Sequence, residues 1–142
     1  MSKNLEFTDK LRSSGLRPTK QRLKICEVLF NRDITFHFTV NNLAERISKE
    51  LNEKISLATV YNTVHAFKNK GYLKEISINS DKSYFDTNTT NHHHFFDEDT
   101  NELIDCSEEV IETPKIKKNI LGKKINSVEV LVKVASDNQN QK

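Results

Sequence analysis

Residues 56–71 read Ser56-Leu-Ala-Thr-Val-Tyr-Asn-Thr-Val-His-Ala-Phe-Lys-Asn-Lys-Gly71, and they are the most informative segment for the fold class. Ser56 is a favourable N-cap and Gly71 a favourable residue just past a helix end, so the stretch predicts one helix with both ends marked. Its apolar residues recur at intervals of three and four, which predicts one buried face: Leu57, Val60, Val64 and Phe67. The opposite arc is small or polar and holds no acidic residue: Ala58, Thr59, Asn62, His65, Ala66 and Asn69. Such a face can enter a DNA major groove without repelling phosphates, although a neutral surface helix would show the same pattern.

Three helices are predicted before this one. Residues 3–13 favour a short helix, and a second is expected to run to about Asn31 with Pro18 in its first turn. Thr39 predicts the N-cap of a third helix, whose apolar residues recur every four positions: Leu43, Ile47 and Leu51.

Two β-rich runs, 73–79 and 83–87, follow the helices and predict a hairpin. A hairpin directly after a helix-turn-helix is typical of a winged helix-turn-helix domain. We place this DNA-binding domain at residues 1–87.

Charge is unevenly distributed along the 142 residues, although the net charge is only +2. Residues 1–75 hold 14 Lys/Arg against 8 Asp/Glu, and the run from Lys10 to Lys24 holds six bases and no acid. This pattern predicts a surface that faces nucleic-acid phosphates, with a solvated helix face as the alternative. The candidate DNA contacts are Arg17, Lys20 and Arg22, together with Thr59, Tyr61 and Asn62 of the predicted recognition helix. The chain shows no membrane-spanning stretch and no secretory signal, so we expect a cytoplasmic protein.

The remaining residues predict a small α/β domain over residues 88–135, so the fold class as a whole is α+β. A hairpin is expected at 92–97 and 102–106, a helix at about 107–121 and an alternating strand at 127–134. So thin a domain buries little surface alone, which predicts a homodimer. Residues 136–142 are polar and are expected to form a disordered tail.

Three consecutive histidines, His92, His93 and His94, are the strongest chemical signal in the second domain. Imidazole is a common ligand of metals and of haem, although a polar loop is the alternative explanation. Strand alternation places His92 and His94 on one face and His93 on the other. If the hairpin turn is centred on residues 99–100, Asp105 stands opposite His94.

His37 and Asp86 of the first domain could complete this site. The set of three imidazoles and two carboxylates then comprises His37, Asp86, His92, His94 and Asp105, and it suits Fe(II), Mn(II), Zn(II) or Co(II). An ion held by residues of both domains would stabilise one arrangement of the two, which is a switch. Each residue also has an ordinary alternative, as a strand end or a loop residue.

The two cysteines, Cys26 and Cys106, exclude a four-cysteine zinc site because the chain has no C-x-x-C pair. Cys26 lies among helix-spaced apolar residues and is expected in the core. Cys106 comes near the histidines, where a redox role stays open.

Three motifs together resemble the ferric uptake regulator (Fur) family over about residues 10–134. They are Gly15-Leu-Arg-Pro-Thr-Lys-Gln-Arg22, Ser56-Leu-Ala-Thr-Val-Tyr-Asn-Thr63, and Lys82-Ser-Tyr-Phe-Asp86 with the downstream histidines. The segment from Ser83 to Phe96, followed by Asn101-Glu-Leu-Ile-Asp105, looks most like the iron response regulator (Irr) branch. The resemblance implies a dimeric, iron-responsive DNA-binding regulator that senses haem.

The resemblance also implies residue roles. The family's regulatory metal site falls on His37, Asp86, His92, His94 and Asp105. Arg17 matches a residue that reaches the minor groove, and Tyr61 and Asn62 match recognition-helix contacts.

The sequence departs from the family at two places. Members with a structural zinc carry C-x-x-C pairs, and here the first pair falls on Asp97 and Thr100 while the second is missing. The Cys-Pro haem motif is missing as well, because Cys26 is followed by Glu27. Haem binding would therefore depend on His92, His93 and His94.

The leading prediction is a dimeric transcription regulator, not an enzyme, that represses iron or haem homeostasis genes. Its ligand would be haem or a divalent metal (Fe, Mn or Zn), and its partner double-stranded DNA with a two-fold-symmetric A·T-rich site. Asp105, where many iron sensors carry Glu, resembles the peroxide-sensing branch, in which bound Fe(II) oxidises its own histidine ligands. A peroxide sensor is therefore the alternative, and a small metal-dependent hydrolase is a third.

Overall fold

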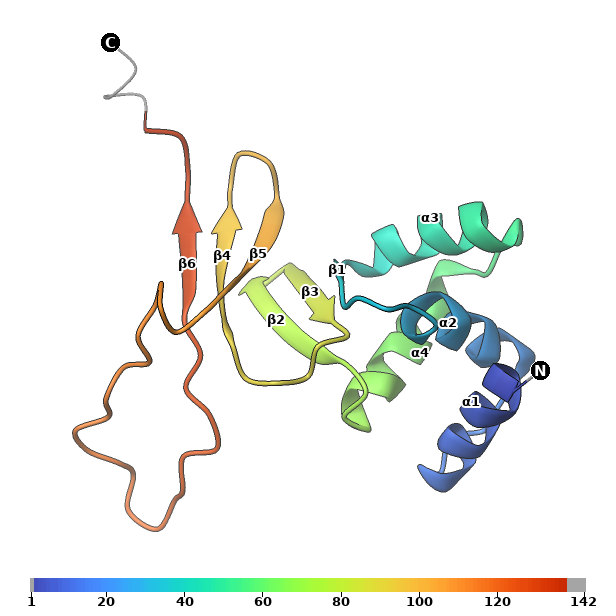
Figure 1. Cartoon of the computed structure of the whole chain (residues 1–142), viewed down its shortest axis with the longest axis horizontal. Helices are drawn as coiled ribbons and strands as arrows, with labels where there is room; N and C mark the ends of the chain where they lie inside the picture. The colour runs from blue at the N-terminus through green and yellow to red at the C-terminus, as the bar shows by residue number, and fades with distance from the viewer. Residues whose placement is uncertain (1, 138–142) are drawn as a thin grey trace. The chain divides into compact units, whose positions relative to one another are not determined.

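The computed structural model of the chain describes residues 2–137 (Figure 1). The described residues form two compact units, divided between Thr89 and Thr90. The first unit holds helices and one small sheet, and the second holds a sheet. The fold class is therefore α+β, as the sequence predicted.

The helices of the first unit follow the predicted order, and the last two begin directly after the predicted capping residues, Thr39 and Ser56. They are α1 (Ser2–Ser13), α2 (Lys20–Phe30), α3 (Val40–Leu51) and α4 (Leu57–Asn69). The side chains of Thr19, Thr39 and Ser56 each accept a hydrogen bond from a backbone N–H of the first turn. Because Thr19 is the N-cap of α2, Pro18 precedes the helix, and its prediction in the first turn was wrong.

The core of the first unit is formed by residues of all four helices named above. Val60, Val64 and Phe67 are fully buried, whereas Leu57, predicted on the same face, is 51% exposed. Leu57 is the first residue of α4, and Ile55 in the preceding loop is buried in the core. The predicted stripe therefore holds for every turn of α4 except the first. Cys26 is buried in this core, as predicted.

A three-stranded antiparallel sheet closes the first unit, with strand order β1-β3-β2. The predicted hairpin is β2 (Lys74–Asn79) and β3 (Lys82–Asp86). The third strand, β1 (His37–Phe38), was not predicted, because we expected His37 in a loop. It pairs with β3 so that His37 stands opposite Asp86 and Phe38 opposite Phe85.

The second unit is a three-stranded sheet of order β5-β4-β6. The predicted hairpin is β4 (His93–Asp97) and β5 (Glu102–Cys106), and its register places His94 opposite Asp105. The last strand, β6 (Leu131–Val134), is shorter than predicted and runs parallel to β4.

The helix predicted at 107–121 is wrong, and the described residues 107–130 form turns and irregular backbone instead. Pro114 lacks a backbone N–H and disfavours helical backbone at the residue before it. The Glu108 carboxylate also accepts hydrogen bonds from the Thr113 N–H (3.2 Å) and the Thr113 hydroxyl (2.5 Å), a local alternative to helical bonding. The second unit therefore lacks the helix of an α/β domain in the described part of the chain.

The end of the described chain is held by hydrogen bonds. The backbone N–H and the hydroxyl of Ser136 donate to the Asp99 carboxylate at 2.6 and 2.5 Å. These bonds hold the pKa of Asp99 below its ordinary value. The disordered tail predicted for residues 136–142 stays a prediction, because residues 138–142 lie outside the described residues.

Candidate metal and nucleic-acid sites

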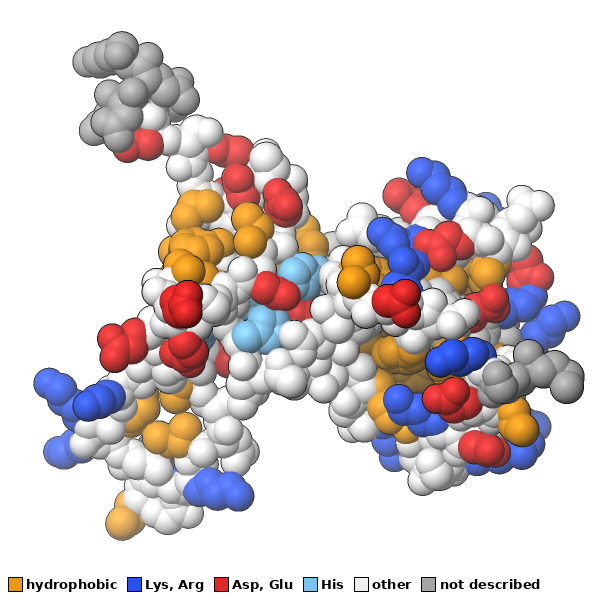
Figure 2. Space-filling view, viewed as in Figure 1, with side chains coloured by type: hydrophobic (Ala, Val, Ile, Leu, Met, Phe, Trp, Pro, Cys, Tyr) orange, Lys and Arg blue, Asp and Glu red, His pale blue; other side chains and the backbone are white. Residues whose placement is uncertain are grey.

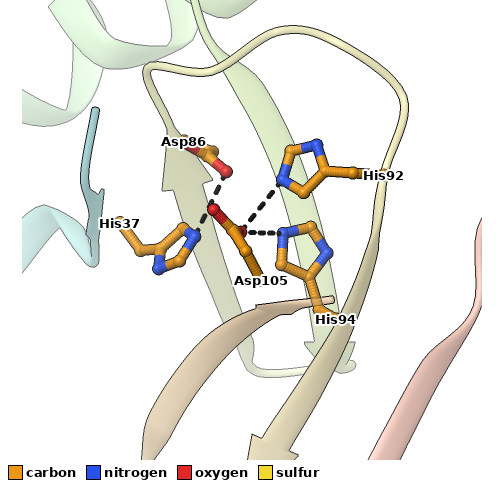
Figure 3. Close-up of side chains that lie close together, drawn as sticks. All are labelled: His37, Asp86, His92, His94 and Asp105. Carbon is orange, nitrogen blue, oxygen red and sulfur yellow. Dashed lines mark hydrogen bonds and ion pairs between the residues drawn. The ribbon is translucent and has the colours of Figure 1, made fainter. Parts of the chain in front are cut away.

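The second unit gathers His92, His94 and Asp105 into one cluster (Figure 3). The Nε2 atoms of His92 and His94 lie 3.0 and 3.1 Å from the same Asp105 oxygen, Oδ1, and the two rings are 4.3 Å apart. His94 is placed by the β4–β5 ladder, and His92 comes just before β4. The predicted alternation is confirmed, since His92 and His94 share this face.

The hydrogen bonding of His92 shows why this cluster suits a cation. Nδ1 lies 2.7 Å from the carbonyl oxygen of Thr90, and a carbonyl only accepts, so Nδ1–H is the donor. In a neutral ring, Nε2 then presents a lone pair to the Asp105 oxygen, which is also an acceptor. Two facing acceptors at 3.0 Å are favoured only with a proton or a metal ion between them.

The first unit pairs His37 with Asp86. Their strands are neighbours, and the His37 Nε2 lies 3.2 Å from the Asp86 Oδ2 (Figure 3). Asp86 is fully buried, and its Oδ1 accepts a hydrogen bond from the Asn88 N–H at 2.8 Å. The pair brings an imidazole nitrogen and a carboxylate oxygen together, both of which are ligands of divalent metals, so it is a second candidate for binding a cation.

The two clusters together contain every residue predicted as a metal ligand. Their donors are imidazole nitrogens and carboxylate oxygens without a thiolate, a set that fits Fe(II), Mn(II) and Zn(II). The residues present therefore fit a divalent metal ion.

His93 points to the opposite face of β4 and is buried, with only 3% of its surface exposed. Its Nδ1 accepts a hydrogen bond from the Val130 N–H at 2.9 Å. The other nitrogen, Nε2, must then carry the proton of the neutral ring, and it donates to the Thr113 hydroxyl oxygen at 2.9 Å. Both ring nitrogens therefore hold the irregular 107–130 segment, and a haem iron could bind His93 only by breaking one of these bonds. No pattern in the sequence predicted this role.

The two cysteines are both buried. Burial raises the pKa of Cys26 to about 12, and the positive charge of Lys10 opposes this rise only in part. Cys26 therefore stays a protonated thiol at neutral pH, which disfavours thiolate chemistry there.

The predicted DNA contacts all lie in the first unit. Tyr61 is half-exposed and Asn62 exposed on α4, while Thr59 is held in its first turn by hydrogen bonds with Ser56. Arg22 donates from Nη1 to the backbone carbonyl of Arg17 at 3.0 Å, which ties the loop before α2 to the helix. In Figure 2, Lys and Arg side chains lie on the surface of the helical unit, interspersed with acidic ones.

None of the helices within residues 2–137 has the length and apolar character needed to cross a membrane.

Comparison with known proteins adds independent evidence. The family model described as "Ferric uptake regulator family" matches residues 13–134. The peroxide-responsive repressor PerR of Staphylococcus aureus (strain Mu50 / ATCC 700699) is 35% identical over 95 residues, which cover 67% of this chain. The match spans 62% of that relative's length, slightly less than two thirds.

Solved structures agree with this match. The Vibrio cholerae ferric uptake regulator is 26% identical with a TM-score of 0.69, and the alignment covers 91% of this chain and 98% of that one. The manganese-bound ferric uptake regulator of Pseudomonas aeruginosa is 22% identical with a TM-score of 0.65, covering 91% and 96%, and supports the fold alone. These relatives are regulators rather than enzymes, so the hydrolase alternative is not supported. Because the family model covers nearly all of the described residues, the chain belongs to the ferric uptake regulator family.

Proposed function

We propose that this chain is a metal-responsive, DNA-binding transcription regulator. Its regulatory ion would be held by His37, Asp86, His92, His94 and Asp105. The proposal rests on one observation: the Nε2 atoms of His92 and His94 lie 3.0 and 3.1 Å from the same oxygen of Asp105, Oδ1. The family of the chain supports the same conclusion.

A divalent cation, when bound, would supply positive charge between these facing acceptors in place of a proton. The chain's own residues do the rest. The Thr90 carbonyl fixes the His92 tautomer in which Nε2 presents its lone pair toward Asp105, and the β4–β5 ladder fixes His94 against Asp105. His37 and Asp86 belong to the first unit, so binding by all five residues would select one arrangement of the two units.

DNA binding is proposed for the first unit, through α4 and the basic residues around α2. Tyr61 and Asn62 would face base edges, while Arg17, Lys20 and Arg22 would face phosphates or the minor groove. A second copy of the chain would present the same surface to the other half of a two-fold-symmetric A·T-rich site.

The second unit supports a homodimer, because its irregular segment leaves large apolar side chains exposed, and hydrophobic side chains are visible on its surface in Figure 2. Leu121 is 98% exposed and Ile120 is 73% exposed. An apolar surface of this kind is typical of a protein–protein contact, and a second copy would cover it. Sedimentation equilibrium of the full chain tests this directly.

The function is tested by measuring metal and DNA binding on the same samples. Mn²⁺, which resists oxidation, is titrated by calorimetry, and binding to a labelled two-fold-symmetric A·T-rich duplex is followed by fluorescence anisotropy with and without Mn²⁺. We expect the DNA affinity to change with Mn²⁺ in the wild type and to stay constant in His92→Ala/His94→Ala. Glu109→Gln, an exposed acidic change in the same unit, is the control. Equal DNA binding with and without metal in the wild type would refute the proposal.

Peroxide sensing is a second candidate, supported by the similarity to the peroxide-responsive repressor. Asp105 is consistent with peroxide sensing, because the sequence resembles the peroxide-sensing branch at this position, where many iron sensors carry Glu. Loading the protein with Fe(II) and adding peroxide should then add oxygen to His37 or His92, detected by mass spectrometry of peptides. Unmodified histidines after this treatment would rule the candidate out and leave the metal-responsive regulator in place.

The iron response regulator branch, with haem as ligand and iron or haem genes as targets, stays a prediction from the sequence. The hydrogen bonds of His93 count against that residue, so haem would have to use His92 or His94. A haem titration followed by absorption spectra, on wild type and on His92→Ala/His93→Ala/His94→Ala, tests it. Identical spectra for the two proteins would rule out haem binding by these histidines.

A further inference from the structure

His65 lies between the exposed surface of α4 and the sheet of the first unit. Its ring centroid is 4.3 Å from that of Tyr61, one helical turn earlier, and 5.7 Å from that of Phe85 on β3. The contact with Phe85 is edge-to-face, at 79°. Tyr61 is half-exposed and Phe85 is buried, so His65 connects a surface ring to a core ring.

The rings continue from Phe85 to the strand that carries His37. Phe85 stacks on Phe38 with centroids 5.9 Å apart, and these two residues are opposite each other in the β1–β3 ladder. The next pair in that ladder is His37 and Asp86. Each of these two candidate metal ligands is therefore the chain neighbour of a ring in the stack.

We propose that His65 is a positioning residue that holds Tyr61 in its DNA-binding orientation and couples it to the His37–Asp86 pair. The proposal rests on the proposed function, in which Tyr61 contacts DNA and His37 and Asp86 bind the ion. His65 itself then contacts neither the ion nor the bases.

The physical basis is the packing of aromatic rings. Tyr61 at a half-exposed position has several rotamers open to it, and the tilted contact with His65 favours one of them. His65 is fixed in turn by the edge contact with Phe85. Because the core is closely packed, a shift of the β1–β3 pair at His37 and Asp86 moves Phe85 and, through His65, the Tyr61 ring.

A competing explanation is that His65 reads a base directly, since it lies on the polar arc of α4. The two explanations differ in what the side chain must provide. A positioning role needs a flat ring, whereas base reading needs a hydrogen-bonding nitrogen. Phe keeps the ring and lacks the nitrogen, so His65→Phe separates the two explanations and His65→Ala removes both functions.

The experiment measures DNA binding and the Tyr61 ring in the same four proteins. They are the wild type, His65→Ala, His65→Phe and the control Ser48→Ala, an exposed change on α3. DNA affinity is measured by anisotropy with Mn²⁺. The Tyr61 ring signals are followed by carbon–proton NMR in the metal-free protein and after titration with diamagnetic Zn²⁺, and circular dichroism confirms folding.

We expect His65→Ala to weaken DNA binding by about two- to ten-fold, the range of a lost aromatic pair, and His65→Phe to restore most of it. The Tyr61 signals should already differ between wild type and His65→Ala without metal. Zn²⁺ should shift them in wild type and in His65→Phe but not in His65→Ala, although all these proteins bind Zn²⁺ equally.

Two results would overturn the inference. The first is DNA binding by His65→Phe as weak as that of His65→Ala, which would make His65 a base contact. The second is a set of Tyr61 signals, with a response to Zn²⁺, that is the same in wild type and His65→Ala. Failure of the proposed function would give a different result, because the DNA affinity of the wild type would then be the same with and without metal. The metal-free Tyr61 signals would still test the contact with His65.

Discussion

His94 and Asp105 stand opposite each other in the β4–β5 ladder, with the His94 Nε2 3.1 Å from the Asp105 Oδ1. The backbone pairing thus fixes the separation of two donor groups that come from different strands. The same Asp105 oxygen also faces His92, so the carboxylate is the shared element of the cluster.

Asp105→Asn should therefore lower the Mn²⁺ affinity by at least about ten-fold, because an amide keeps the shape of the carboxylate but loses its charge. Calorimetric titration measures the change. Glu102→Gln, an exposed acidic change on the same strand, is the control and should bind Mn²⁺ as the wild type does. Equal Mn²⁺ affinity in Asp105→Asn would exclude Asp105 as a ligand.

His93→Ala should destabilise the second unit by about 1–3 kcal/mol, because it leaves the Val130 N–H and the Thr113 hydroxyl without their buried partner. Hydrogen exchange gives the local test. The Val130 amide should exchange faster in the variant, while amides of α4 in the first unit should keep their protection. Unchanged exchange at Val130 would show that His93 does not hold the segment.

Cys26 should resist thiol reagents in the native protein at pH 8, because its pKa is raised to about 12 by burial. Mass spectrometry after iodoacetamide treatment, with and without denaturant, measures this. The native fold holds the thiol proton more tightly than the unfolded chain does. The stabilisation is thus complete below about pH 9, the ordinary value, and is lost as the pH rises toward 12. Cys26→Ala should remove this part of the alkaline loss of stability, and rapid labelling of native Cys26 would contradict the assignment.

Ser136→Ala should raise the pKa of Asp99 toward its ordinary value, because the serine side chain is the first cause of the lowering and its backbone N–H is the second. A carboxyl-carbon NMR titration measures the shift. Because the pKa of Asp99 is lower in the folded protein, the carboxylate contributes stability at pH values above its ordinary pKa of 3.8. This contribution is lost as the pH falls through the folded-state pKa. Ser127→Ala is the control, and an unchanged pKa in Ser136→Ala would mean that Ser136 does not bind Asp99 in solution.

The sequence predicted those parts of the fold that local signals determine. Ser56 and Thr39 cap their helices as expected, and the two hairpins follow from alternation and turn residues. The face shared by His92 and His94, and the pairing of His94 with Asp105, follow from the same alternation.

The errors have a physical pattern. β1 contains only His37 and Phe38, too short for any periodicity, and it forms through pairing with a strand far away in the sequence. The helix expected after Cys106 fails because Pro114 and the Glu108–Thr113 hydrogen bonds favour another backbone. Leu57 was predicted to be buried but is exposed, because periodicity does not show where the surface that packs against a helix ends.

The position of β4 between β5 and β6 has a thermodynamic consequence. Because hydrogen bonds on both sides hold this strand, folding of the second unit already orders His94, and binding an ion adds little entropic cost there. Affinity for the ion and stability of the sheet are then linked quantities, and a ligand that binds only the folded sheet raises its melting temperature in proportion to the logarithm of its concentration. The melting curve of the second unit thus becomes a scale on which candidate ions can be ranked without any DNA present.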